Sequence, residues 1–98
     1  MTPADVQVTF CATLVDQWIA LGMQHAVVSP GSRSTPMALA LASRDDLEVH
    51  MAHDERTAAF MALGIGVSSG LPAALLCTSG TAATHFHAAV VEIGRAHV

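Results

Sequence analysis

The 98-residue sequence has no lysine and no tyrosine, and it contains only one tryptophan, two cysteines and four arginines. With a formal net charge of −4 and no basic stripe, it lacks the cations with which a nucleic-acid-binding protein neutralises phosphates. Cys11 and Cys77 are too few for a disulfide framework. We therefore expect buried free thiols in a cytoplasmic protein.

Long apolar runs are also missing. No stretch approaches the roughly 20 apolar residues that cross a bilayer, and the first residues have no basic segment typical of a signal peptide. The hydrophobic fraction is nevertheless 52%, and only 12% of the residues are charged. One small domain forms easily from such a chain, but it cannot bury all of this apolar surface. We expect a partner, a second copy or further chain to cover the excess.

Helix-like segments alternate with short apolar segments. A first helix begins at Thr2-Pro3 and ends at Gly22, and its apolar stripe contains Phe10, Leu14 and Trp18. Strands are expected at 26–29, 47–52 and 72–78, and further helices at 35–43, at 54–70 and after 81. Strands that are apolar on both faces are typical of a buried parallel sheet. The sequence therefore predicts the α/β class, with a three-layer αβα arrangement.

Ligands of parallel sheets bind at the carboxyl ends of the strands, where this chain places three polar loops. In the loop 29–34, Gly31 permits a close backbone approach and Arg33 suits a carboxylate or a phosphate. The loop 53–56 offers carboxylates for acid–base chemistry, and 78–81 is a turn of small residues. For the first two loops an ordinary turn, and acidic residues favoured by a helix dipole, are the better explanation, and for the third a packing turn explains the residues equally well.

The histidines do not form an evident metal site in the sequence. His85 and His87 are two residues apart, so they would point to different sides of a helix. His50 and His53 have no third ligand nearby in the sequence. We therefore expect no zinc site and no metal ligand in this chain.

The three loops together resemble a known family. SPGSRSTP at 29–36, DERTAAF at 54–60 and CTSGTAA at 77–83 are similar to motifs of the pyrimidine-binding domain of thiamine diphosphate enzymes. The first motif resembles most specifically the 2-succinyl-5-enolpyruvyl-6-hydroxy-3-cyclohexene-1-carboxylate synthase family of menaquinone biosynthesis. The resemblance covers roughly residues 9–91. It implies an incomplete N-terminal domain of a carboligating transferase at 1–91, inactive on its own.

The resemblance also implies functions for single residues. Glu55 matches the catalytic glutamate that contacts N1′ of the cofactor's aminopyrimidine, and Ser32 and Arg33 match residues that hold a substrate carboxylate. Pro30, Ser79 and Gly80, with Glu55, would contact thiamine diphosphate. The implied substrates are 2-oxoglutarate and isochorismate. The diphosphate and its Mg²⁺ would be held by a domain absent from this chain, in a homodimer or homotetramer.

Two other functions remain open. The chain is also similar to the corresponding part of acetohydroxyacid synthase or a 2-oxo-acid decarboxylase, although an arginine in the first loop favours a multiply charged substrate. A small α/β binding module, complete in itself, is the non-enzymatic alternative. Separately, residues 92–98 look like the translation of a common sequencing adapter, so we predict that this tail is not native.

Overall fold

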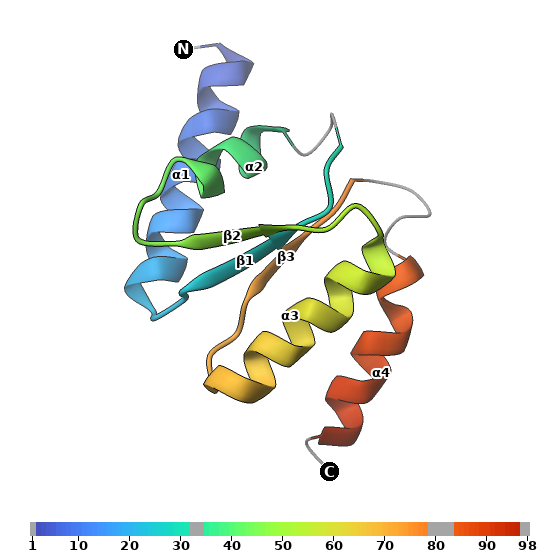
Figure 1. Ribbon diagram of the computed structural model, residues 1–98. Coiled ribbons are helices and arrows are strands. Elements are labelled where there is room, and N and C mark those ends of the chain that lie inside the picture. The colour runs from blue at the N-terminus through green and yellow to red at the C-terminus, as the bar shows by residue number, and fades with distance from the viewer. Residues whose placement is uncertain (1, 32–34, 79–83, 97–98) are drawn as a thin grey trace.

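The computed structural model describes residues 2–31, 35–78 and 84–96. Four helices and three strands alternate along this part of the chain (Figure 1): α1 Pro3–Ala20, β1 His25–Val28, α2 Thr35–Ala42, β2 Glu48–Met51, α3 Glu55–Ser69, β3 Ala74–Leu76 and α4 His87–Ala96. This alternation confirms the predicted α/β class.

The three strands form one parallel sheet in the order β2-β1-β3, so the first strand of the chain is the central one. His25 of β1 lies opposite Glu48 of β2, and Val28 lies opposite both Met51 of β2 and Leu76 of β3. Parallel pairing requires a crossover between successive strands, and α2 and α3 are the crossover helices. All three strands therefore end at the same edge of the sheet.

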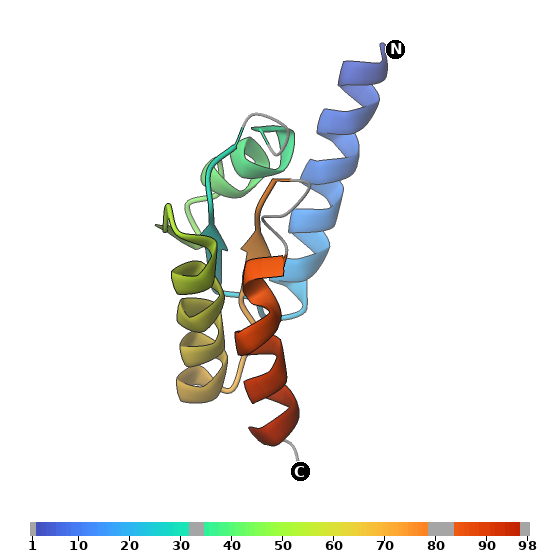
Figure 2. The same ribbon diagram turned by 90° about the vertical axis from the view of Figure 1, so that its right-hand side faces the viewer.

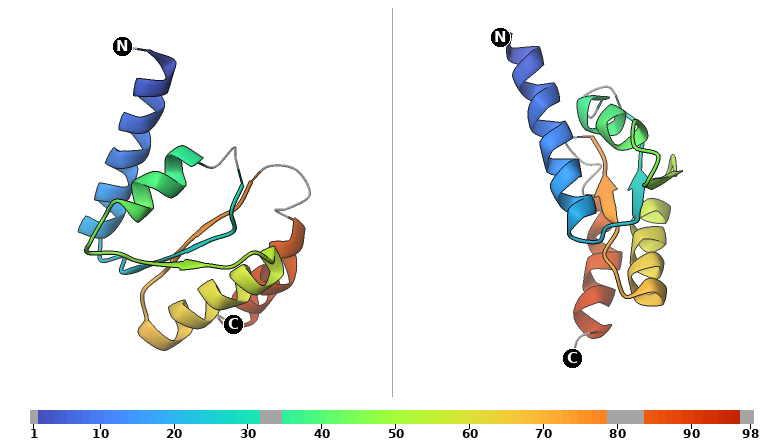
Figure 3. Two further views of the ribbon diagram at one scale, coloured as in Figure 1. Left: turned by 45° about the horizontal axis from the view of Figure 1, so that its top comes forward. Right: turned by 90° about the vertical axis from the view of Figure 1, so that its left-hand side faces the viewer.

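Helices cover both faces of this sheet (Figures 2 and 3), as expected for three layers. α1 and α2 pack on one face, whereas α3 packs on the other with α4 beside it. Alternation along β1 divides the core accordingly, since Ala26 and Val28 face α1 and α2 while Val27 faces α3. The core between the sheet and the helices α1 and α2 contains Val15 and Leu41, which are both 1% exposed.

Local capping explains where two of the helices begin. The hydroxyl of Thr2 accepts from Asp5 N, and the Asp5 carboxylate accepts from Thr2 N, which together form a capping box at α1. Asp54 caps α3 by accepting from the backbone N–H groups of Arg56 and Thr57. The expected helix starts at Pro3 and after Asp54 are thereby confirmed.

The buried stripe expected along α1 is shorter in the structure. Phe10 was predicted to lie in the buried stripe of α1, but it is 63% exposed. The reason is that the N-terminal half of α1 projects beyond the sheet (Figure 2), so only the following turns meet the core.

β3 is shorter than the predicted 72–78, and the α-helical part of the last helix begins at His87. The predicted start of that helix, at 81, lies outside the described residues.

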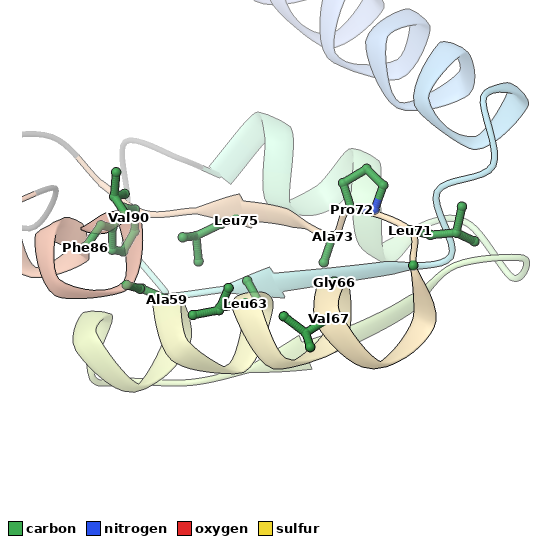
Figure 4. Close-up of a pocket in the computed structure, with 13 residues that line it drawn as sticks. Ala59, Leu63, Gly66, Val67, Leu71, Pro72, Ala73, Leu75, Phe86 and Val90 are labelled. Atoms are coloured by element: carbon green, nitrogen blue, oxygen red, sulfur yellow. The ribbon is translucent and has the colours of Figure 1, made fainter. Parts of the chain in front are cut away.

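The structure leaves much apolar surface uncovered. Large exposed side chains lie on α1 (Val6, Val8 and Phe10), on α3 (Phe60, Met61 and Val67) and on α4 (Val90 and Val91). An apolar groove of about 610 Å³ is lined by residues of α3, β3 and α4 (Figure 4). Within the described part of the chain, no helix is both long and apolar enough to span a membrane.

Candidate active site at the carboxyl ends of the strands

Ser29, directly after β1, joins the ends of all three strands. It is 2% exposed, and its hydroxyl donates to the backbone oxygen of Ala52 at 2.7 Å, just after β2. Its backbone N–H donates to the oxygen of Leu76 of β3 at 2.8 Å. One small buried residue thus fixes where the loops after β1 and β2 leave the sheet.

Gly31 packs directly against the loop that follows β3. A Cβ atom at position 31 would overlap the side chain of Thr78. No residue larger than glycine therefore fits here unless Thr78 moves. The close approach seen at Gly31 is to Thr78 of this chain, whereas the predicted approach of a ligand to this glycine stays a prediction.

The acidic pair after β2 divides into a capping residue and a residue available for chemistry. The Asp54 carboxylate is engaged by two backbone N–H groups, with distances of 2.8 Å to Arg56 N and 3.2 Å to Thr57 N. Glu55, the first residue of α3, is half-buried, and none of the described residues donates a hydrogen bond to its carboxylate. Asp54 therefore caps the N-terminus of α3, whereas the carboxylate of Glu55 is available to bind a ligand.

A polar hollow of about 540 Å³ opens beside Glu55. His53, Asp54, Glu55 and Arg56 line it from the start of α3, and His85 lines it from the turn before α4. Carboxylate, guanidinium and imidazole groups here face one space, so the hollow suits a polar ligand that accepts and donates hydrogen bonds.

Cys77, which follows β3, lies within the electrostatic reach of Glu55. Burial raises the pKa of the Cys77 thiol, and the negative charge of Glu55 raises it further. The thiol also donates to the backbone oxygen of Thr78 at 3.1 Å. Both Cys11 and Cys77 are free thiols, and Cys11 is buried whereas Cys77 is half-buried.

The structure describes two of the six predicted site residues. Glu55 is half-buried at the edge where ligands were expected, and Pro30 is exposed in the loop after β1. The predicted residues Ser32, Arg33, Ser79 and Gly80 lie outside the described residues.

Sequence reasoning assigned no function to two residues that the fold brings to Glu55. Cys77 was considered only as a buried thiol, and His85 only as half of a metal pair. Cys77 directly follows β3, whose parallel pairing with β1 brings it to the edge where α3 begins, and His85 lines the hollow from just before α4. The signal for Cys77 was its position at the end of a predicted strand, whereas His85 fell within a predicted helix and carried no such signal.

The neighbours of His50 in the structure differ from the pair with His53 that the sequence suggested. His50, the third of the four residues of β2, lies with His25 and Glu48, and ligand atoms of these three side chains lie within 4.8 Å of one another. Sequence spacing misses this cluster because His25 comes from a different strand, 25 residues earlier.

Comparison with known proteins decides the family. Residues 8–98 match the thiamine pyrophosphate enzyme family, in its N-terminal TPP-binding domain. The chain belongs to that family. The half-buried Glu55 and the converging loops therefore stand in a thiamine pyrophosphate-binding domain, as the resemblance of the three motifs implied.

The chain is also similar to several curated proteins named 2-succinyl-5-enolpyruvyl-6-hydroxy-3-cyclohexene-1-carboxylate synthase. Identity is 48% to the Bacillus pumilus protein, over 89% of this chain and 15% of that protein. It is 47% to the Natronomonas pharaonis protein, over 100% of this chain and 17% of the relative. For Thermobifida fusca it is 51%, over 87% of this chain and 15% of the relative. The chain thus spans about a sixth of the length of the relatives it matches.

Proposed function

We propose that this chain supplies the aminopyrimidine-binding part of a thiamine diphosphate-dependent synthase. The reaction proposed is decarboxylation of 2-oxoglutarate and addition of the succinyl-semialdehyde unit to isochorismate, in menaquinone biosynthesis. The observation that carries this proposal is Glu55, a half-buried carboxylate beside a polar hollow in a domain of the thiamine pyrophosphate family. The names of the relatives support the particular reaction.

The residues around Glu55 suit an aminopyrimidine. A half-buried carboxyl group shares a proton with a ring nitrogen more strongly than an exposed one, because little water competes for the hydrogen bond. Gly31, in the loop after β1, packs against the side chain of Thr78 and so holds the loops after β1 and β3 together beside this site. We assign Glu55 the task of holding a proton at N1′ of the ring.

The remaining predicted residues keep the functions that the resemblance implied. Pro30, Ser79 and Gly80 would contact the cofactor with Glu55, and Ser32 and Arg33 would bind a substrate carboxylate. An arginine fork suits such a group because it donates two parallel hydrogen bonds. When bound, thiamine diphosphate supplies the carbon nucleophile that attacks a 2-oxo acid. Its diphosphate and Mg²⁺ would be held by another domain.

The decisive experiment places residues 1–91 into the corresponding segment of the Bacillus pumilus relative. In this chimera, Glu55→Gln should leave the fold intact and largely abolish hydrogen–deuterium exchange at C2 of the bound cofactor, whereas the exposed control Asp45→Asn should not. Undiminished exchange in Glu55→Gln would refute the assignment. In the same chimera, Arg33→Lys should weaken substrate binding more than cofactor binding, and equal losses would count against Arg33 as a substrate ligand.

The isolated chain distinguishes the enzyme from a self-contained binding module. We propose that the 98 residues alone are inactive and do not bind thiamine diphosphate tightly, and calorimetric titration with Mg²⁺ present tests this directly. Tight binding by a stable monomer would support the module instead. We further propose a cytoplasmic homodimer or homotetramer for the whole enzyme. The non-native tail at 92–98 stays a prediction, which the genomic locus tests; α4 itself continues through Ala96.

A further inference from the structure

Two histidines and a glutamate of β1 and β2 gather on one face of the sheet, with His25 and Glu48 at the amino ends of their strands and His50 third of four in β2. His25 is the first residue of β1 and pairs in register with Glu48, the first residue of β2. His50 lies two residues further along β2, so its side chain projects from the same face as that of Glu48. Strand pairing alone therefore brings three possible metal ligands to one face of the sheet.

The distances between the ligand atoms match those of a small coordination sphere. His25 Nδ1 lies 3.1 Å from His50 Nε2 and 3.5 Å from a carboxylate oxygen of Glu48. All three ligand atoms lie within 4.8 Å of one another. In tetrahedral zinc with bonds of about 2.0–2.2 Å, neighbouring ligand atoms are roughly 3.3–3.6 Å apart.

Small side-chain adjustments complete the geometry. The two imidazole rings stack with their centroids 5.3 Å apart and their planes at 25°. Turning both nitrogen lone pairs toward one ion requires rotation about χ2, which is a soft torsion for histidine. The Glu48 side chain is 68% exposed and is free to adjust, whereas His25 is 26% exposed and held by its strand.

We propose that His25, Glu48 and His50 form a binding site for a zinc-type divalent transition metal ion. Imidazole nitrogens with one carboxylate suit Zn²⁺, whereas Mg²⁺ and Ca²⁺ prefer oxygen ligands throughout. Three protein ligands at a partly exposed sheet edge leave a fourth position open to water. This site is separate from the Mg²⁺ expected with the cofactor, because that ion would be held by another domain.

The bound ion would link the central strand to an edge strand. β2 pairs only with β1 among the described strands, so it is held by one set of ladder hydrogen bonds. A metal bound by the folded chain and not by the unfolded chain raises the apparent stability in proportion to its affinity. We therefore assign the site a structural function at the β1–β2 edge.

The test uses the untagged 98-residue chain and Zn²⁺ in competition with a chromophoric chelator. We expect one ion per chain, and His25→Gln and His50→Gln should each weaken binding by about tenfold or more, since even residues that only orient ligands cost about that much. Glu48→Gln should weaken it less. The control His87→Gln removes an exposed histidine outside the cluster and should bind like the parent chain.

A second measurement avoids dependence on folding of the variants. Cobalt(II) added to the parent chain should give the intense visible absorption of a tetrahedral site and should broaden the ring NMR signals of His25 and His50 before those of the other histidines. Zn²⁺ should also raise the thermal midpoint of the parent chain and of His87→Gln. Failure of the parent chain to bind, equal loss in the control, or broadening centred on other histidines would each overturn the proposal.

Discussion

The two ends of the sheet are held together by different kinds of contact. At the carboxyl ends, buried small residues fix the loops: Ser29 joins three strand ends, and Gly31 fits directly against Thr78. Where β1 and β2 begin, the half-buried His25 and the exposed Glu48 meet the half-buried His50, and their ligand atoms lie within 4.8 Å of one another. The comparison teaches that small buried residues join the strands at their carboxyl ends, whereas partly exposed polar side chains meet where β1 and β2 begin.

Among substitutions that test this difference, the largest change in the free energy of unfolding is expected at Gly31. Gly31→Ala places a Cβ atom against Thr78 and should lower the free energy of unfolding by up to about 3 kcal/mol, as overpacking does. The matched control is Gly64→Ala in α3, where an added Cβ meets nothing within 4 Å, so it should stabilise by up to about 1 kcal/mol. Urea titrations measure both. Adding Thr78→Ala to Gly31→Ala should restore part of the loss, and equal stability of the two glycine variants would refute the close packing.

A somewhat smaller effect is expected at Ser29. Ser29→Ala leaves the Ala52 carbonyl without its 2.7 Å hydrogen bond in a buried place, which should cost about 2 kcal/mol. Ser43→Ala removes a similar bond to Ala40 at an exposed site, where water replaces it, and should cost less than about 0.5 kcal/mol. Denaturant midpoints compare the two, and similar losses in both variants would show that Ser29 does not hold the strand ends.

The start of α3 should be less sensitive. Asp54→Ala removes the side chain that accepts from Arg56 N and Thr57 N, at a cost of about 1 kcal/mol. Asp45→Ala, an exposed acid that caps no helix, is the control and should be close to neutral. Thermal unfolding followed by circular dichroism distinguishes them. An unchanged midpoint in Asp54→Ala would show that the Asp54 cap does not stabilise α3.

The smallest effect is expected for the electrostatic influence of Glu55 on the pKa of the Cys77 thiol. The raised pKa of the Cys77 thiol should fall partly in Glu55→Gln, so alkylation at a given pH should become faster; burial, the larger cause, remains. Alkylation rates against pH, assigned by mass spectrometry, measure this, and Glu48→Gln at the other end of the sheet should change nothing. Because the folded chain holds the thiol proton more tightly than the unfolded chain, stability should fall as the pH rises past the ordinary thiol pKa. Equal shifts in both variants would contradict the assigned proximity.

Much of the fold could be predicted from local patterns. Thr2 and Asp54 begin helices because their side chains satisfy free backbone N–H groups, and Gly70 ends α3 with a positive φ of 75°. Phe10 was misplaced because periodicity shows which residues share a helix face but not how far the neighbouring sheet extends. The candidate site was predictable to the same degree: Glu55 follows a strand and begins a helix, whereas Cys77 reaches it only through strand order.

By itself, the sequence determined the α/β class, the alternation of elements and the three loops that carry the family motifs, because each depends on residues near one another in the chain. Only the tertiary structure decided that β1 is central, that Gly31 meets Thr78, and that His25 joins Glu48 and His50. These contacts join distant segments, and they depend on the order and register of parallel strands, which no local pattern specifies.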